Sequence, residues 1–222
     1  MKVIIVLADS ELELVPVQTA EVDTELEAVQ SMHAIPVLDQ YFHHDLMQKL
    51  PESTRRGRAD IVHNCLSLCQ NSIPNRKGIL QVYVHTRDDK VIEVDPKIDI
   101  PPNYIKFLND MGTLLKGGSV PGYKLTSRSF KDLVQDINAD LVVALTPVGG
   151  ERPMKEMFES RSSGSVLSIV GGFPEGDYKS PVMRTADVHI SLGPRLMRAP
   201  EVISEVLQSV PKVTSLMKNE KG

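Results

Sequence analysis

The segment Leu141-Val142-Val143-Ala144-Leu145 is a continuous apolar run that leads directly into the turn-rich segment Thr146-Pro147-Val148-Gly149-Gly150. A short apolar run that ends in turn-forming residues is typical of a strand buried on both faces of a sheet. The same pattern recurs twice further along the chain, at 166–177 and at 188–195. The last third of the chain is therefore expected to hold three buried strands, each followed by a loop.

Helical patterns at 154–159 and 201–210 lie between or after these strands. Near the N-terminus, Val3 to Leu7 is a further apolar run and is expected to be another buried strand. Strands that alternate with helices predict an α/β fold with a mostly parallel sheet.

The three loops at the strand ends are the best candidates for a ligand site. In open α/β sheets, ligands bind outside the carboxyl ends of the strands. Glycines such as Gly171 and Gly172 permit positive φ angles and let backbone groups approach a ligand closely. Together the loops suggest a single pocket lined by backbone. The alternative, that glycine and proline only form tight turns here, stays open.

Several cofactor motifs are absent from the sequence. It contains no G-x-x-x-x-G-K-[ST] phosphate loop and no G-x-S-x-G nucleophile turn. The segment Gly171-Gly172-Phe173-Pro174-Glu175-Gly176 does not match the dinucleotide fingerprint G-x-G-x-x-G. A cofactor held by backbone groups and an apolar wall remains, and an adenosyl sulfonium compound fits that description better than NAD or ATP.

The middle of the chain is expected to add shorter elements. The acidic segment 11–27 resembles a loop followed by a short helix, and 116–127 a flexible crossing segment. Asp60 is a plausible N-cap of a helix. Two strands joined by a tight turn are expected at 80–84 and 91–94, and two further helices at 41–50 and 101–115.

Composition places limits on location and partners. No apolar run approaches the ~20 residues that span a bilayer, and no signal-peptide cleavage site follows Leu7, so we expect a cytoplasmic protein without a membrane partner. A net charge of −4 argues against coating nucleic acid by bulk electrostatics. A local basic patch is still present at Arg55, Arg56 and Arg58, although such clusters are often only solvated surface.

Cys65 and Cys69 are the only cysteines in the chain. With His63 they resemble half of a metal site, but no second Cys/His pair supplies the remaining ligands. We therefore interpret them as small buried apolar side chains and expect no metal.

The sequence around the basic patch carries a family resemblance. Arg58-Ala59-Asp60-Ile61-Val62-His63 matches R-x-D-I-x-H, and Gly78-Ile79-Leu80-Gln81-Val82-Tyr83-Val84-His85-Thr86 resembles G-x-L-Q-V-Y-I-x-T. Both motifs are similar to those of the Nep/Emg family of ribosomal RNA pseudouridine N1-methyltransferases. The resemblance extends from about residue 50 to the C-terminus and includes Val94-Asp95-Pro96-Lys97-Ile98-Asp99-Ile100-Pro101 and the glycine loop 170–176.

The resemblance implies a SPOUT fold, in which the C-terminal part of the sheet forms a trefoil knot. It implies a single methyltransferase domain over 1–222, with an inserted or extended region at about 39–128. It also implies a homodimer formed through the C-terminal helix. The apolar stripe Val202, Ile203, Val206, Leu207 and Val210 is suited to that role, or alternatively packs on the chain's own sheet.

The resemblance further implies an S-adenosyl-L-methionine cofactor, a small-subunit ribosomal RNA substrate and a role in ribosome biogenesis. Arg58 would meet the RNA, with Asp60 holding it. Where the family has three arginines to grip RNA, this chain has Asp99, Pro102 and Lys106, so Lys106, Arg55 and Arg56 become the remaining candidates. The implied cofactor contacts are Leu145, Gly171, Gly176, Ile190, Ser191, Leu192, Gly193, Pro194, Arg195 and Leu196.

Two catalytic roles follow from the chemistry of pseudouridine, whose N1–H must lose its proton as the methyl group arrives. Asp60 would accept the proton, or Arg58 would stabilise the anionic ring. Residues two apart within a helix do not face each other, so contact between them requires Arg58 to precede the helix. The alternatives are that Asp60 only caps and Arg58 is only a surface cation, that the protein is a non-catalytic RNA-binding assembly factor, or that it methylates another RNA.

Overall fold

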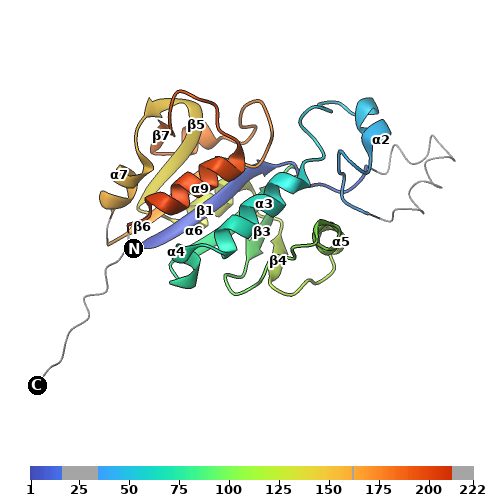
Figure 1. Ribbon diagram of the computed structural model, residues 1–222, viewed down its shortest axis with the longest axis horizontal. Coiled ribbons are helices and arrows are strands. Elements are labelled where there is room, and N and C mark those ends of the chain that lie inside the picture. The colour runs from blue at the N-terminus through green and yellow to red at the C-terminus, as the bar shows by residue number, and fades with distance from the viewer. Residues whose placement is uncertain (17–34, 162, 212–222) are drawn as a thin grey trace, which may run out of the picture.

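The computed structural model describes residues 1–16, 35–161 and 163–211. Its strands form one seven-stranded sheet in the order β4-β3-β2-β1-β6-β5-β7, with β1 near the middle (Figure 1). Their bounds are Lys2–Ser10, Leu80–Thr86, Val91–Val94, Tyr123–Thr126, Leu141–Glu151, Ser165–Gly171 and Val188–Ser191 for β1 to β7. The pairs β1–β2, β1–β6, β5–β6 and β5–β7 are parallel, whereas β2–β3 and β3–β4 are antiparallel. The expected α/β fold with a mostly parallel sheet is confirmed.

The central strand β1 is buried on both faces. Val3, Ile5 and Leu7 point into one core, whereas Ile4, Val6 and Ala8 point into the other. Side chains alternate between the faces of a strand, so a run that is apolar at every position has to be covered on both sides. This alternation explains why the run lacks the polar positions of a surface strand.

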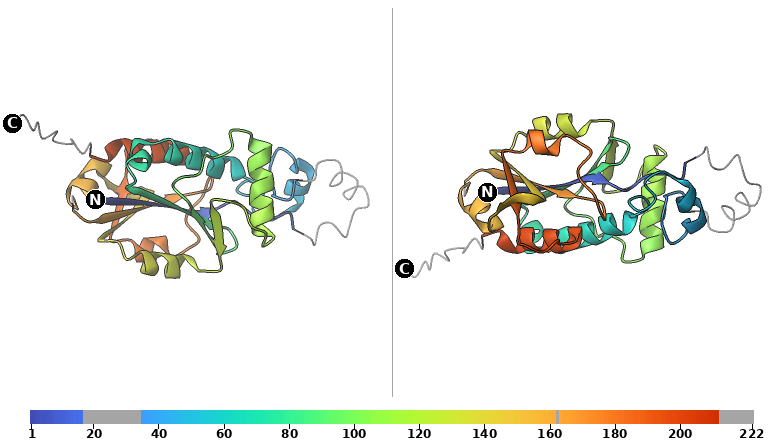
Figure 2. Two further views of the ribbon diagram at one scale, coloured as in Figure 1. Left: turned by 90° about the horizontal axis from the view of Figure 1, so that it is seen from below. Right: turned by 90° about the horizontal axis from the view of Figure 1, so that it is seen from above.

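Helices cover both faces of the sheet. α3 and α9 lie side by side on one face, and α6 and α8 on the other, as the two views of Figure 2 agree. The described helices are α2 His44–Lys49, α3 Ala59–Gln70, α4 Ile73–Arg76, α5 Tyr104–Leu115, α6 Phe130–Ile137, α7 Met154–Glu159, α8 Val182–Thr185 and α9 Ala199–Ser209.

Three expectations about local structure are corrected. The segment 116–127 is not simply a crossing segment, because β4 forms within it and pairs with β3. Asp60 is not an N-cap, since α3 begins at Ala59 and Arg58 occupies the capping position. The segment 146–150 belongs to β5 rather than following it, although the pairing with β7 is interrupted between Leu145 and Gly150.

Two other expectations stay predictions. Much of the acidic segment 11–27, including its expected helix, lies outside the described residues. The trefoil knot and the division into a core and an insertion at about 39–128 stay predictions. In the structure that stretch supplies β2, β3 and β4 of the same sheet.

Candidate functional site

A cavity of about 920 Å³ opens where β5, β6 and β7 end. Its walls come from three segments of the chain within 145–151, 170–178 and 190–202, and from the start of α3. Parallel strands place their carboxyl ends at the same edge of the sheet, which is why loops far apart in sequence meet here. The three turn-rich loops thus line one pocket.

Every residue expected to contact the cofactor lines this cavity. The set comprises Leu145, Gly171, Gly176, Ile190, Ser191, Leu192, Gly193, Pro194, Arg195 and Leu196. Arg58 and Asp60 lie in its wall as well, although they are more than 80 positions from Leu145 in the chain. The structure therefore brings the two groups of expected site residues together. Their contact with a ligand stays a prediction.

The interrupted part of β5 forms one wall. Leu145 and Gly150 both pair with Ile190 of β7, so the residues between them leave the ladder as a bulge. Val148 in this bulge is 79% exposed, whereas Leu145 is buried. Bulges of this kind bend a strand and re-aim its side chains next to functional sites.

The glycine-rich loop 171–178 forms a second wall and is tied to the sheet. The Gly172 N–H donates to the Ala8 carbonyl at 2.8 Å, and the Glu11 N–H donates to the Gly172 carbonyl at 3.1 Å. The Tyr178 hydroxyl donates to the Leu145 carbonyl at 2.8 Å, which joins this loop to β5. Burial raises the pKa of Tyr178, so its hydroxyl stays protonated and remains a donor.

Arg58 and Asp60 form an ion pair in the cavity wall. Arg58 Nε and Nη2 donate to the two oxygens of Asp60 at 2.8 and 2.9 Å. The contact is possible because Arg58 precedes the helix, with φ −115° and ψ 46°. Hydrogen bonding to Asp60 raises the pKa of Arg58, so the guanidinium stays charged. The Asp60 side chain remains 40% exposed.

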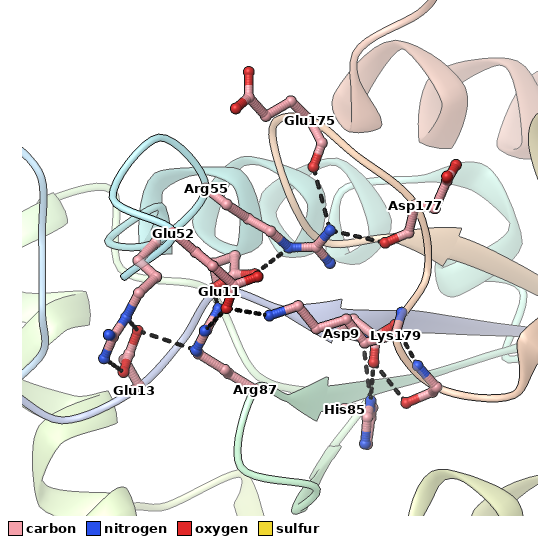
Figure 3. Close-up of polar contacts among 12 residues, drawn as sticks. Asp9, Glu11, Glu13, Glu52, Arg55, His85, Arg87, Glu175, Asp177 and Lys179 are labelled. Carbon is pink, nitrogen blue, oxygen red and sulfur yellow. Dashed lines mark hydrogen bonds and ion pairs between the residues drawn. The ribbon is translucent and has the colours of Figure 1, made fainter. Parts of the chain in front are cut away.

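Arg55 and Arg56 do not form an exposed basic patch with Arg58, which corrects the expected patch, and their burial argues against the predicted contact with RNA. Both are buried, and each is paired with a buried glutamate that follows β1. Figure 3 shows the pair of Arg55 with Glu11. Arg55 Nε lies 2.5 Å from Glu11, and Arg56 holds Glu13 through two bonds of 2.8 and 2.6 Å. Using Arg56 for RNA would leave the buried Glu13 without its hydrogen-bonded counter-charge, and using Arg55 would remove one of the two arginines that hold Glu11. Breaking a buried ion pair in this way is unfavourable.

Other basic residues lie apart from the cavity. Lys106 is exposed on α5 and pairs with Asp110 at 2.8 Å, so it remains accessible to RNA but is not a cavity residue. Arg76 lies in α4, which follows the C-terminal end of α3, whereas Arg58 precedes the N-terminal end of α3. Because α3 rises about 1.5 Å per residue, its ends are about 18 Å apart.

A network around Asp9 was missed by the sequence analysis. Its carboxylate accepts hydrogen bonds from the Lys179 and Ser180 N–H groups at 2.7 and 3.0 Å and from the Ser180 hydroxyl at 2.6 Å. The Asp9 N–H donates to His85 Nδ1 at 3.1 Å. The segment that follows the glycine-rich loop is thereby held to the end of β1 (Figure 3). Acidic residues directly after a buried strand were the available signal.

The cysteines lie apart from this site. Cys65 and Cys69 lie in α3 and are both buried in the core. Burial raises the pKa of Cys69 to about 12. Across residues 1–16, 35–161 and 163–211, no group of His, Cys, Asp and Glu side chains is arranged to hold a metal ion. Within the same ranges, no helix has the length and apolar character needed to span a membrane.

Comparison with known proteins gives a consistent match. A family model described as EMG1/NEP1 methyltransferase matches residues 5–210. The ribosomal RNA small subunit methyltransferase Nep1 of Thermococcus kodakarensis is 36% identical over 217 residues, covering 91% of this chain and 94% of that protein. Nep1 of Pyrobaculum aerophilum is 35% identical and covers 96% of this chain and 100% of its own length.

A solved structure is also similar. The crystal structure of Archaeoglobus fulgidus Nep1 bound to S-adenosylhomocysteine superposes with a TM-score of 0.81 at 27% sequence identity. The match covers 95% of this chain and 97% of that one.

Proposed function

Because the chain belongs to the EMG1/NEP1 methyltransferase family, we propose that it is an S-adenosylmethionine-dependent methyltransferase of small-subunit ribosomal RNA. We further propose that the methyl group goes to N1 of a pseudouridine. The observation that carries the proposal is the meeting of the three strand-end loops with the Arg58–Asp60 pair in the wall of one cavity.

The cavity suits an adenosyl sulfonium cofactor. Its volume of about 920 Å³ falls within the range of small-molecule sites. Leu145, Ile190 and Leu192 supply apolar surface, while glycines on two loops expose backbone groups. Gly176 has a φ of +84°, so the loop adopts a turn that a residue with a side chain would rarely take. The expected contacts Gly171, Gly176 and the run 190–196 would hold the cofactor.

When bound, S-adenosylmethionine supplies an activated methyl group, so the protein must mainly align the acceptor and stabilise charge. Arg58 is placed for the second task. Pseudouridine has a free N1–H, whereas uridine is joined to ribose through N1. The ring gains negative charge as that proton leaves, and the Arg58 guanidinium stabilises that charge.

Asp60 acts on Arg58 in this mechanism. Both oxygens of its carboxylate already accept hydrogen bonds from the guanidinium of Arg58, and these two bonds fix the orientation of that planar group. In this proposal Asp60 takes no proton, and the N1 proton leaves to solvent. The role of Asp60 is to position Arg58, and proton acceptance by Asp60 is the competing outcome.

We also propose that two chains associate as a homodimer that contacts RNA around the cavity mouth. Arg195 and Arg198 line the cavity and are exposed, as is Arg152 next to the lining residue Glu151. Arg195 is paired with Glu201 only at 3.9 Å. Together with Arg58 these three arginines provide cations for RNA phosphates, whereas Arg55 and Arg56 are internal.

Calorimetric titration with S-adenosylhomocysteine, followed by a methylation assay, tests the proposal. We expect one binding site per chain and methyl transfer to a small-subunit RNA hairpin that contains pseudouridine. The same hairpin with uridine is the matched control and should accept no methyl group. Binding without transfer to either hairpin would point instead to an assembly factor, and transfer to transfer RNA alone would change the substrate. No binding by well-folded protein would contradict the proposal as a whole.

A further inference from the structure

Arg55 connects the glycine-rich loop to the sheet without lining the cavity. Its Nη1 donates to the Asp177 carbonyl at 2.8 Å and to the Glu175 carbonyl at 3.3 Å. Its Cζ lies 3.9 Å from the ring centroid of Phe173. One guanidinium thus contacts three residues of the loop that lines the cavity, and Figure 3 shows two of them, Glu175 and Asp177.

The opposite side of Arg55 is anchored to Glu11, at the end of the central strand β1. Nε donates to Glu11, whose second carboxylate oxygen accepts from Arg87 at 2.7 Å. Glu11 follows β1 directly, and its side chain is 1% exposed. The arginine therefore joins the loop to the central strand through a buried and charged contact.

These contacts are specific for arginine. The guanidinium is a planar fork with five N–H donors, so it can hold a carboxylate and two carbonyls and still lie over an aromatic ring. A lysine ammonium is a point charge without that geometry. Buried ion pairs are weak stabilisers of a fold, because desolvation offsets much of the attraction. Arg55 Nη2 is also buried without a hydrogen-bond partner in the described part of the chain, and this adds to the free-energy cost of burying Arg55.

We infer that Arg55 is a positioning residue that keeps the loop 171–178 in the conformation that binds the cofactor. This inference rests on the proposed function. Arg55 precedes Arg58 by three positions, so the same short segment fixes the cofactor loop and presents the residue expected to face the RNA. Without Arg55 the loop samples other conformations, and apparent affinity falls with the fraction of competent molecules.

Arg56 provides a matched control within the same segment. It is buried to a similar degree, with 8% of its surface exposed against 6% for Arg55, and it is paired with a glutamate of the same strand extension. Its two side-chain hydrogen bonds in the described structure go to Glu13 rather than to the loop. Replacing it removes a comparable buried ion pair and leaves the loop contacts in place.

The experiment compares Arg55→Met with Arg56→Met in full-length protein. S-adenosylhomocysteine affinity is measured by calorimetry, and the thermal midpoint is measured without ligand. We expect the Kd to rise about tenfold for Arg55→Met and to stay within about threefold of the wild type for Arg56→Met. In steady-state assays the KM for S-adenosylmethionine should rise more than kcat falls. Should Arg55→Met fail to fold, Arg55→Lys serves the same test, because lysine keeps the charge but lacks the fork.

The outcomes separate the two proposals. Wild-type protein that binds no S-adenosylhomocysteine contradicts the proposed function. A wild type that binds, together with an Arg55 variant of unchanged Kd, contradicts only the role of Arg55. If the Arg55 and Arg56 variants lost affinity equally and their midpoints of thermal unfolding fell equally, Arg55 would have only a general structural role. That result would overturn the inference as well.

Discussion

At the scale of single residues, three arginines within four positions have three different environments. Arg55 holds a loop, Arg56 is buried against Glu13, and Arg58 lies in the cavity wall. Sequence spacing does not distinguish them, since the partner carboxylates of the first two lie more than 40 positions away. The location of the nearest carboxylate decides the role of each one.

The pairing of Arg58 with Asp60 gives a first prediction. We expect Asp60→Asn to lower kcat/KM for RNA about tenfold, the size of one lost charge-assisted hydrogen bond. The pH–rate profile should keep its shape, because Asp60 orients Arg58 and takes no proton. Arg58→Lys keeps the charge without the fork, and it should impair the reaction by at least as much.

A different result would identify Asp60 as a general base. Loss of a general base typically slows a reaction by about 10²- to 10⁴-fold. A decrease of that size in a folded Asp60→Asn protein, with the acidic limb of the pH–rate profile abolished, would contradict the positioning role.

Glu52 gives a prediction about pH. It accepts hydrogen bonds from Lys179, at 2.6 Å, and from Arg87, and these bonds lower its pKa from 4.5 to about 2. A carboxyl whose pKa is lower in the folded state stabilises the fold above its unfolded pKa, and this contribution is lost as the pH falls toward the folded value. The Glu52 side chain is 44% exposed, so the contribution should be under about 1 kcal/mol.

Urea unfolding of the wild type and Glu52→Gln measures this contribution. The wild type should be more stable at pH 7, and the difference should shrink steadily between pH 5 and 2.5. A difference that stays constant over this range would show that the carboxylate charge is not responsible.

At the scale of elements, the bulge of β5 depends on close contact between backbones. A Cβ on Gly149 would come within 2.6 Å of the backbone of Ile190, whereas a Cβ on Gly150 would meet nothing within 4 Å. Only the absence of a side chain at Gly149 allows β5 to approach β7 at the cavity wall.

Gly149→Ala and Gly150→Ala therefore form a matched pair. We expect Gly149→Ala to lower the free energy of unfolding by about 1–3 kcal/mol, the usual cost of overpacking, and to weaken S-adenosylhomocysteine binding. Gly150→Ala should change stability by less than about 0.5 kcal/mol. Denaturant unfolding and calorimetry check both, and equal behaviour of the two variants would refute this account of the bulge.

At the scale of the whole molecule, the apolar stripe of α9 serves the chain's own core first. Ile203 and Val206 are fully buried, and Val210 is 8% exposed. Val202 and Leu207 are only partly buried at the edge of the same core, and they are the part of the stripe available to a second chain. The proposed homodimer therefore uses the margin of the helix rather than its buried face.

Sedimentation equilibrium tests the proposed dimer. We expect a species of twice the 24.6 kDa of one chain for the wild type, and a monomer for Leu207→Lys, whose charge would be desolvated at the interface. Glu205→Lys, on the exposed side of α9, should remain dimeric. A monomeric wild type at micromolar concentration would contradict the dimer.

The sequence by itself determined the fold class and the family, and it predicted the edge of the sheet where the candidate cavity lies. Continuous apolar runs such as Val3 to Leu7 require burial on both faces, and parallel strands place their following loops together. These properties depend on the local sequence, so they can be predicted without the tertiary structure. The segment 116–127 was misassigned because the pairing of β4 depends on β3, which is a non-local partner.

Only the tertiary structure decided which charges are available for function. Glu11 and Glu13 follow a buried strand, and their burial draws Arg55 and Arg56 into the interior, where a charge needs a counter-charge. The same arrangement leaves Arg58 with a neighbouring aspartate at the cavity wall. Burial and ion pairing depend on residues brought together from distant parts of the chain, so spacing along the sequence determines neither.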